Sequence, residues 1–204
     1  VTFYDGDPQT GGQPLGSTQV ITQIMAGQSQ AVQLLWTPTQ VGQQRIYAWI
    51  DPTNQIAEAN EDNNTITLTV IVREPAPDLA VSGLWIKGNA IHNHPTPLAV
   101  TIVNYGEAAA ANVIVQFFEG DPQQGGVQIG TTQVITLFPA GATRQVTITW
   151  LPSAAGTQPV YAWADFTGVI PELSETNNSS MQSFPVREPG IDLGLAYQAL
   201  QVGG

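Results

Sequence analysis

Two loops carry the side chains of this sequence that are best suited to chemistry. One spans residues 51–64, with the sequence DPTNQIAEANEDNN, and the other spans residues 165–178, with the sequence DFTGVIPELSETNN. Their shared carboxylates and amides are the hard oxygen ligands that Ca²⁺ prefers, although the spacing is not that of an EF-hand. We therefore predict a calcium site in each loop. The candidate ligands are Asp51, Glu58, Glu61 and Asn63 in the first loop and Asp165, Glu172, Glu175 and Asn177 in the second.

A purely structural role is the alternative for the same two loops. Asp and Asn side chains accept hydrogen bonds from nearby backbone amides and so shape turns without any ligand. Glutamates on a solvated loop need no ligand either. If a cation does bind there, it would screen acidic charge and stiffen the junction with a preceding module. The sequence leaves both interpretations open.

The other polar clusters are typical of turns and not of an active site. His92 and His94 have a spacing that zinc ligands can adopt, but no Cys and no obvious third ligand accompanies them. Hydrolysis by two acids requires that they converge in a cleft, whereas Glu58 and Glu61 lie together on a loop. Neither His belongs to a recognisable Ser-His-Asp arrangement. We predict that the chain is not an enzyme.

The charge of the chain argues against two classes of partner. Its 204 residues contain 16 Asp and Glu against 5 Lys and Arg, which gives a net charge of −11. A surface of this charge repels nucleic acid and anionic membranes. No apolar run approaches the ~20 residues that are needed to span a bilayer. We expect no nucleic-acid partner and no membrane insertion in this segment.

An internal repeat sets the organisation of the chain. FYDGDPQTGG at residues 3–12 returns as FFEGDPQQGG at residues 117–126, and YAWID at residues 47–51 returns as YAWAD at residues 161–165. Both pairs are offset by 114 residues, and the alignment needs no gap. A period of this length suits a bead-like domain and is too long for a solenoid repeat.

The repeat is out of phase with the ends of the sequence. We predict a partial module over residues 1–77, a complete module over residues 78–190 and the first strand of a third module over residues 191–204. The partial module lacks a counterpart of residues 78–114. Two explanations stay open: the sequence is a window cut from a longer array, or another chain supplies the missing strands, as in strand-complemented fibres.

Seven short strands are predicted in the complete module. Val146, Ile148 and Trp150 alternate with Thr147 and Thr149, which is the pattern of a half-buried strand. Turn signals separate the strands, and this arrangement is typical of an all-β, immunoglobulin-like (fibronectin-III-like) β-sandwich. The predicted strands span residues 78–87, 97–105, 112–119, 127–137, 144–151, 159–165 and 179–186.

The partial module repeats the later part of this pattern. One predicted strand is lined by Val32, Leu34 and Trp36, and the last strand by four alternating apolar residues. Trp36 and Trp150 are predicted to pack in the cores. For the strand in which Tyr47 and Trp49 alternate with Ile46 and Ala48, and for its copy with Tyr161 and Trp163, the sequence does not decide which face points outward. An outward aromatic stripe would contact a neighbouring module or a glycan. The last strand's apolar residues are Ile66, Leu68, Val70 and Val72.

These motifs together resemble a known family. An Asp-Leu pair opens the complete module, Val103, Asn104 and Gly106 mark a turn, and V-x-F-F-x-G-D-P follows from Val115. The most specific piece is D-x(6)-E-x-x-E-x-N-N, which begins at Asp165. The combination resembles CARDB, the cell-adhesion-related domain found in bacteria. The resemblance implies a sandwich similar to immunoglobulin and fibronectin-III domains, in tandem units of secreted or surface-anchored proteins.

The sequence as a whole indicates a non-enzymatic structural or adhesive protein outside the cell. We expect it to be extracellular or on the cell surface, as part of a stalk, filament or adhesin. Its expected partners are neighbouring copies of the same module, in a homopolymer or a longer array, and a glycan is a further candidate ligand. Calcium is the only cofactor that the residues suggest. The alternative function is a carbohydrate-binding or spacer module of a secreted hydrolase.

Overall fold

The protein consists of two compact β-units. The structure is a computed structural model that describes residues 1–191. One unit spans Val1–Glu74 and the other begins at Pro75. A single 3-10 turn, η1 (Pro122–Gln124), is the only helical element in residues 1–191. The predicted all-β class is confirmed. The strand predicted over residues 191–204 lies outside the described residues, apart from Ile191.

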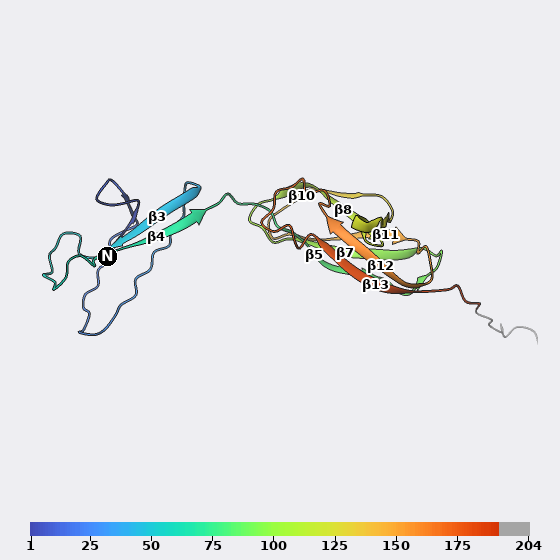
Figure 1. The fold of residues 1–204 in the computed structure, drawn as a ribbon, viewed down its shortest axis with the longest axis horizontal. Helices are drawn as coiled ribbons and strands as arrows, with labels where there is room; N and C mark the ends of the chain where they lie inside the picture. Colours follow the sequence, from blue (N-terminus) through green and yellow to red (C-terminus); the bar gives the residue numbers. More distant parts are fainter. Residues whose placement is uncertain (192–204) are drawn as a thin grey trace, which may run out of the picture. The chain divides into compact units, whose positions relative to one another are not determined.

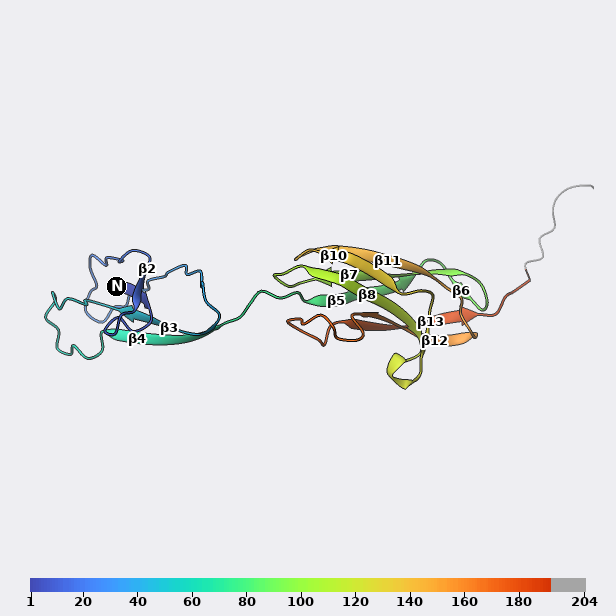
Figure 2. The same cartoon turned by 90° about the horizontal axis from the view of Figure 1, so that it is seen from above.

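The second unit is a sandwich of two sheets (Figures 1 and 2). All of its paired strands are antiparallel except β13 and β6, which pair in parallel. Each of the seven predicted strands is present, while the short β6 was not predicted. The first sheet has the order β11 (Thr143–Trp150), β7 (Thr96–Asn104), β5 (Leu79–Ile86). The second has the order β10 (Gln133–Phe138), β8 (Ala110–Glu119), β12 (Gly156–Ala164), β13 (Ser179–Arg187), β6 (Ala90–Ile91), with β9 (Val127–Gln128) beside β8.

Alternating side chains of the two sheets form the core of the second unit. In β11, Val146, Ile148 and Trp150 are buried while Thr147 and Thr149 are exposed, as their alternation predicted. Burial of a large apolar side chain contributes about 1.5–3 kcal/mol, so this face drives the sheets together. Trp150 is 0% exposed, which confirms its predicted place in the core.

The first unit is a single four-stranded sheet. Its order is β2 (Gln13–Leu15), β1 (Thr2–Asp5), β3 (Gly42–Trp49), β4 (Thr65–Val72). The repeat holds at the level of single backbone pairs: Gly42 lies opposite Val72 as Gly156 lies opposite Val186. The predicted last strand of this module is confirmed as β4.

The strand predicted through Val32, Leu34 and Trp36 is wrong. Residues 16–41 contain no strand and run as a long loop, drawn in blue in Figure 1. The counterpart of residues 29–36 in the repeat is β11, and the one partner strand of β11 is β7. The repeat gives β7 no counterpart in residues 1–77. A strand without a neighbour has no ladder for its backbone groups. Trp36 is consequently half-buried, and it does not take the core position predicted for it.

A tight turn follows the end of β8 in the second unit. Asp121 caps η1 by accepting a hydrogen bond from the Gln123 amide at 2.9 Å. A Cβ on Gly126 would lie 2.3 Å from the Gly120 carbonyl oxygen, so the close approach of the two backbones requires glycine there. The Asp-Pro and Gly-Gly residues therefore build this turn, which protrudes from the second unit in Figure 2.

Candidate functional site

The loop between β12 and β13 folds back on Asp165. This residue follows β12 directly, is 4% exposed and has a left-handed φ of 49°. Its Oδ2 accepts a hydrogen bond from the Ile170 amide at 2.7 Å, and its carbonyl accepts one from Gly168 at 2.9 Å. An aspartate tolerates this backbone conformation because its side chain bonds the loop that it turns.

Glu172 in the same loop binds the start of β5. Its Oε2 accepts a hydrogen bond from the Leu79 amide, and its Oε1 accepts one from Asn178 Nδ2 at 3.0 Å. Glu175 supports this arrangement, since its Oε1 accepts from the Glu172 amide at 3.2 Å and its Oε2 from Asn178 Nδ2 at 3.3 Å. The two glutamates therefore have structural partners within the unit.

Asn177 adds a second attachment to the same strand. Its Nδ2 donates to Asp78 Oδ1 at 2.8 Å, and its carbonyl accepts from the Val81 amide at 3.0 Å. The Leu173 amide donates to the Pro77 carbonyl at 2.9 Å. The loop of residues 165–178 thus holds residues 77–81 by backbone and side-chain bonds. We call this set of contacts the strand clamp.

The sequence interpretation missed Asn104 as a member of this end of the sandwich. Asn104 is 0% exposed, and its Oδ1 accepts from the amides of Asp78 and Gly106, both at 3.1 Å. Its Nδ2 donates to the carbonyls of Ala108, Phe138 and Pro139 at 2.9–3.2 Å. The signal was in the turn motif at Asn104 and Gly106, which was used for the resemblance and not for contacts.

The loop of the first unit repeats the internal bonds that Asp165 and Glu175 make. Asp51 has a φ of 45° and accepts from the Ile56 amide at 2.7 Å. Glu61 accepts from the Glu58 amide at 2.9 Å and from Asn64 Nδ2 at 3.2 Å. No counterpart of residues 77–81 exists in this unit. Glu58 and Asn63, the counterparts of Glu172 and Asn177, therefore lack the strand that the clamp holds.

Burial gives the clamp an electrostatic cost. Desolvation raises the pKa of Glu172 to about 7, and the negative charges of Glu175 and Asp165 add to the rise. The Leu79 amide and the Asn178 side chain oppose it, because they donate hydrogen bonds to the carboxylate. Glu172 is therefore a carboxyl group that titrates near neutral pH at the start of the module.

The geometry gives the calcium prediction mixed support. Within residues 1–191, no three His, Cys, Asp or Glu side chains are grouped so as to hold a metal ion. On the other hand, Asn177 Oδ1 and Asn178 Oδ1 are buried without a hydrogen-bond partner, and such oxygens are what Ca²⁺ coordinates. The candidate ligands of both loops stay a prediction.

The two histidines do not come together as ligands. The His92 Nδ1 lies 3.2 Å from Glu188 Oε2, and the His94 Nδ1 lies 2.9 Å from the His92 carbonyl. Each ring thus has a partner of its own, and the contact between His92 and Glu188 attaches the segment after β6 to the residue that follows β13.

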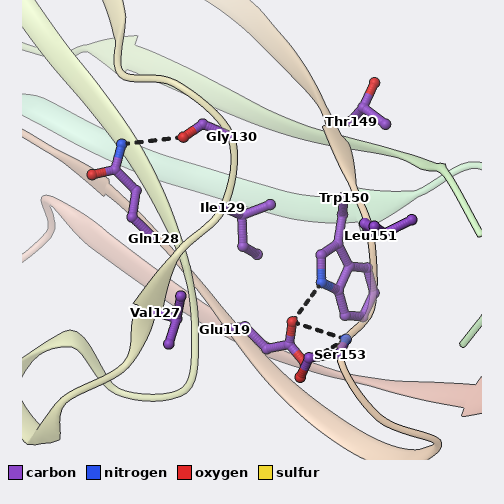
Figure 3. A pocket seen from close by; sticks show the side chains of 9 residues that line it. All are labelled: Glu119, Val127, Gln128, Ile129, Gly130, Thr149, Trp150, Leu151 and Ser153. Atoms are coloured by element: carbon purple, nitrogen blue, oxygen red, sulfur yellow. Dashed lines mark hydrogen bonds between the residues drawn. The ribbon is translucent and has the colours of Figure 1, made fainter. Parts of the chain in front are cut away.

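A pocket at the opposite end of the second unit contains one carboxylate (Figure 3). Glu119 accepts hydrogen bonds from Trp150 Nε1 at 3.0 Å and from the Ser153 hydroxyl at 2.7 Å. Figure 3 shows that these bonds join the end of β8 to the last residue of β11 and to the segment that follows it. The carboxylate satisfies the buried indole N–H, which is a structural task.

The aromatic stripe on β12 faces outward. Val160 and Ala162 are 0% exposed and point into the core, so Tyr161 and Trp163 lie on the other face and are half-buried. The Trp163 ring packs edge-on against Phe166, with centroids 5.1 Å apart. The question that the sequence left open is thereby answered for the second unit.

The raised pKa of Glu172 predicts how stability depends on pH. The pKa is higher in the folded state, at about 7, than the ordinary value of 4.5. Glu172 therefore stabilises the fold most below about pH 4.5, and this contribution is lost as the pH rises through 7. Because Glu172 is partly exposed, solvent screens its charge and only part of the pKa shift becomes stability. Compared with the Glu172→Gln variant, the native protein should lose about 1 kcal/mol, or roughly 4 °C in Tm, between pH 5 and 8.

The measurement is thermal unfolding followed by circular dichroism across this pH range. Glu58→Gln, at the counterpart position in the first unit, is the matched control. Its Tm should change between pH 5 and 8 by the same amount as the native Tm. A native Tm that rises relative to that of Glu172→Gln between pH 5 and 8 would contradict the prediction.

Comparison with known proteins identifies the family. The family model CARDB matches residues 1–68 and 76–182. No curated protein matches the chain. The CARDB domain of a Pyrococcus furiosus protein, solved in complex with di-metal ions, is 20% identical, and the match covers 54% of this chain and 89% of that one, with a TM-score of 0.47. A domain from Methanosarcina acetivorans is 20% identical over 54% of this chain and 92% of that one, with a TM-score of 0.46. Because the family model covers most of the sequence, the chain belongs to the CARDB family.

Proposed function

We propose that the protein is a non-enzymatic extracellular module that forms part of a stalk, filament or surface adhesin. CARDB is a cell-adhesion-related family, and none of the helices in the described residues has the length and apolar character of a membrane span. The observation that carries the proposal is the strand clamp, because it fixes residues 77–81 just after the segment that leaves the first unit. Such a clamp suits modules that follow one another in a chain.

The segment between the units supports this function. β4 ends at Val72 and β5 begins at Leu79. The carbonyl of Ala76 accepts hydrogen bonds from the amides of Glu107 and Ala108, at 3.0 and 3.3 Å, and that of Pro77 accepts from Leu173. The second unit thereby holds the end of the segment, and the short remainder contains Pro75, which restricts its backbone. Short, restricted connections suit a load-bearing array of modules.

The location of the protein on cells tests the proposal. An antibody raised against residues 1–191 should label intact cells of the organism that makes the protein, and protease added outside the cells should remove the label. Labelling only after lysis would contradict an extracellular module. A cytoplasmic protein of the same cells is the control for membrane integrity.

Calcium stiffening is the finer part of the proposal, and it rests on the partnerless oxygens of Asn177 and Asn178 beside Glu172 and Glu175. Millimolar CaCl₂ should raise the Tm above that in EDTA, because a ligand that binds only the folded state stabilises it. Glu175→Gln should reduce this shift, while Val127→Ala at the other end of the unit should not. An equal Tm in EDTA and CaCl₂ would rule calcium out.

A carbohydrate-binding module is the second candidate, and the outward face of β12 favours it. Tyr161 lies opposite Phe118 and Trp163 opposite Gln116 in the register of β8 and β12, so the residues paired with these aromatics carry no charge. Trp163→Ala should weaken retention of the protein in gels that contain neutral polysaccharides such as xyloglucan or glucomannan, by about fivefold for one stacking contact of about 1 kcal/mol. Val134→Ala, on the same face of β10 at the far side of β8, is the control. Retention equal to that of a gel without polysaccharide would contradict sugar binding.

A further inference from the structure

One face of the first unit is apolar and has no covering sheet. Phe3, Ile46 and Ala48 are only half-buried, and Ile66 and Leu68 beside them are 71% and 63% exposed. These five residues line one groove on the sheet. An apolar surface of this kind on a four-stranded sheet is a binding surface or an aggregation hazard.

The second unit shows what covers the same face. The counterparts of Phe3, Ile46 and Ala48 are Phe117, Val160 and Ala162, and all three are 0% exposed. They belong to the core in which Leu98, Val100 and Ile102 of β7 are also 0% exposed. The sheet of β11, β7 and β5 is therefore the cover, and two of its three strands come from residues 78–114.

The backbone of the first unit is also in register for the missing half of β8, which belongs to the sheet opposite this cover. In the second unit Gln133 pairs with Val115 at the first rung of the ladder between β10 and β8. In the first unit the counterparts Gln19 and Val1 make the same pair, with N–O distances of 2.7 and 2.8 Å. This first backbone pair of the ladder forms because both of its residues are present in the first unit. No strand continues from it.

The loop of residues 51–64 in the first unit also has part of the structure that holds a strand in the second unit. Asp51 and Glu61 already make the internal bonds that Asp165 and Glu175 make. Glu58 occupies the position from which Glu172 accepts the Leu79 amide. The loop therefore has the acceptor bonds of Asp51 and Glu61 in place before any strand is bound.

We propose that this open face is a docking surface for a second copy of residues 78–114 of the repeat. The copy adds counterparts of β5, β6, β7 and the first half of β8. Its β7 pairs with residues 29–36 as an antiparallel strand, its β5 enters the clamp at Glu58, and its apolar residues at positions 98, 100 and 102 cover Phe3, Ile46 and Ala48. The inference deepens the proposed array of modules but does not require an extracellular location.

The test places a second copy of residues 78–114 directly before Val1 of the full chain, which continues the repeat without a gap. Amides of residues 29–36 should exchange with D₂O roughly 100-fold more slowly than in the original chain. The indole N–H of Trp36 should also exchange more slowly, because its ring becomes buried as that of Trp150 is. The matched control carries Leu98→Asp and Val100→Asp in the added copy alone and should show neither change.

A second variant shows whether the result depends on the exposed apolar residues of β4, Ile66 and Leu68. Ser180 and Gln182 are the counterparts of Ile66 and Leu68, so Ile66→Ser with Leu68→Gln should retain the slowed exchange in the fused chain. Equal exchange of residues 29–36 in the fused chain and its Asp control would overturn the proposal. So would a dimer of the original chain, by sedimentation equilibrium, in which Ile66 and Leu68 are protected, because the face would then cover itself. Surface labelling of cells is unaffected by either outcome.

Discussion

A β-strand needs a neighbouring strand for its backbone hydrogen bonds, and this constraint decides the structure of both units. The second unit contains β5 and β7, and around them every strand of the repeat forms. The first unit lacks both, and residues 16–41 make no strand although their sequence closely follows that of residues 130–155. The pair Val1–Gln19 shows how local the effect is, since the ladder forms for the one rung with both members.

Buried polar groups at the start of the second unit also need hydrogen-bond partners, and residues of the loops supply them. Asn104 joins three segments by five hydrogen bonds while it is 0% exposed. The strand clamp does the same for the start of β5 through Glu172 and Asn177. Loss of one partner would leave the other buried and unsatisfied, at a cost of about 1–3 kcal/mol. Specific polar contacts thus decide where the first strand begins, while apolar burial holds the sheets together.

The sequence predicted most of the second unit and little of the first. Alternation such as that of Val146, Ile148 and Trp150 is a local signal, and each strand that it predicted is present where a partner exists. The strand through Trp36 has the same local pattern and fails, because a pattern carries no information on whether a partner is available. The two-residue β6 is too short to leave any pattern.

The candidate site was also predicted only in part from the sequence. The acidic loops were singled out from the sequence because their carboxylates and amides recur at a fixed offset. Their contacts with residues 77–81 are separated by more than ninety positions in the chain, as between Leu79 and Glu172, and no spacing rule reveals such a contact. The outward direction of Tyr161 followed only once Val160 and Ala162 were seen to be buried.

The parallel pairing of β6 with β13 has a mechanical consequence. Val186 lies opposite Ala90 and Arg187 opposite Ile91, next to the point where the chain leaves the second unit. When the chain is pulled at its C-terminal end, β13 is loaded along its length against β6, so the bonds between them resist together and do not open one after another. This two-residue strand thus lies beside the point at which tension on the C-terminal end of the second unit would first be felt.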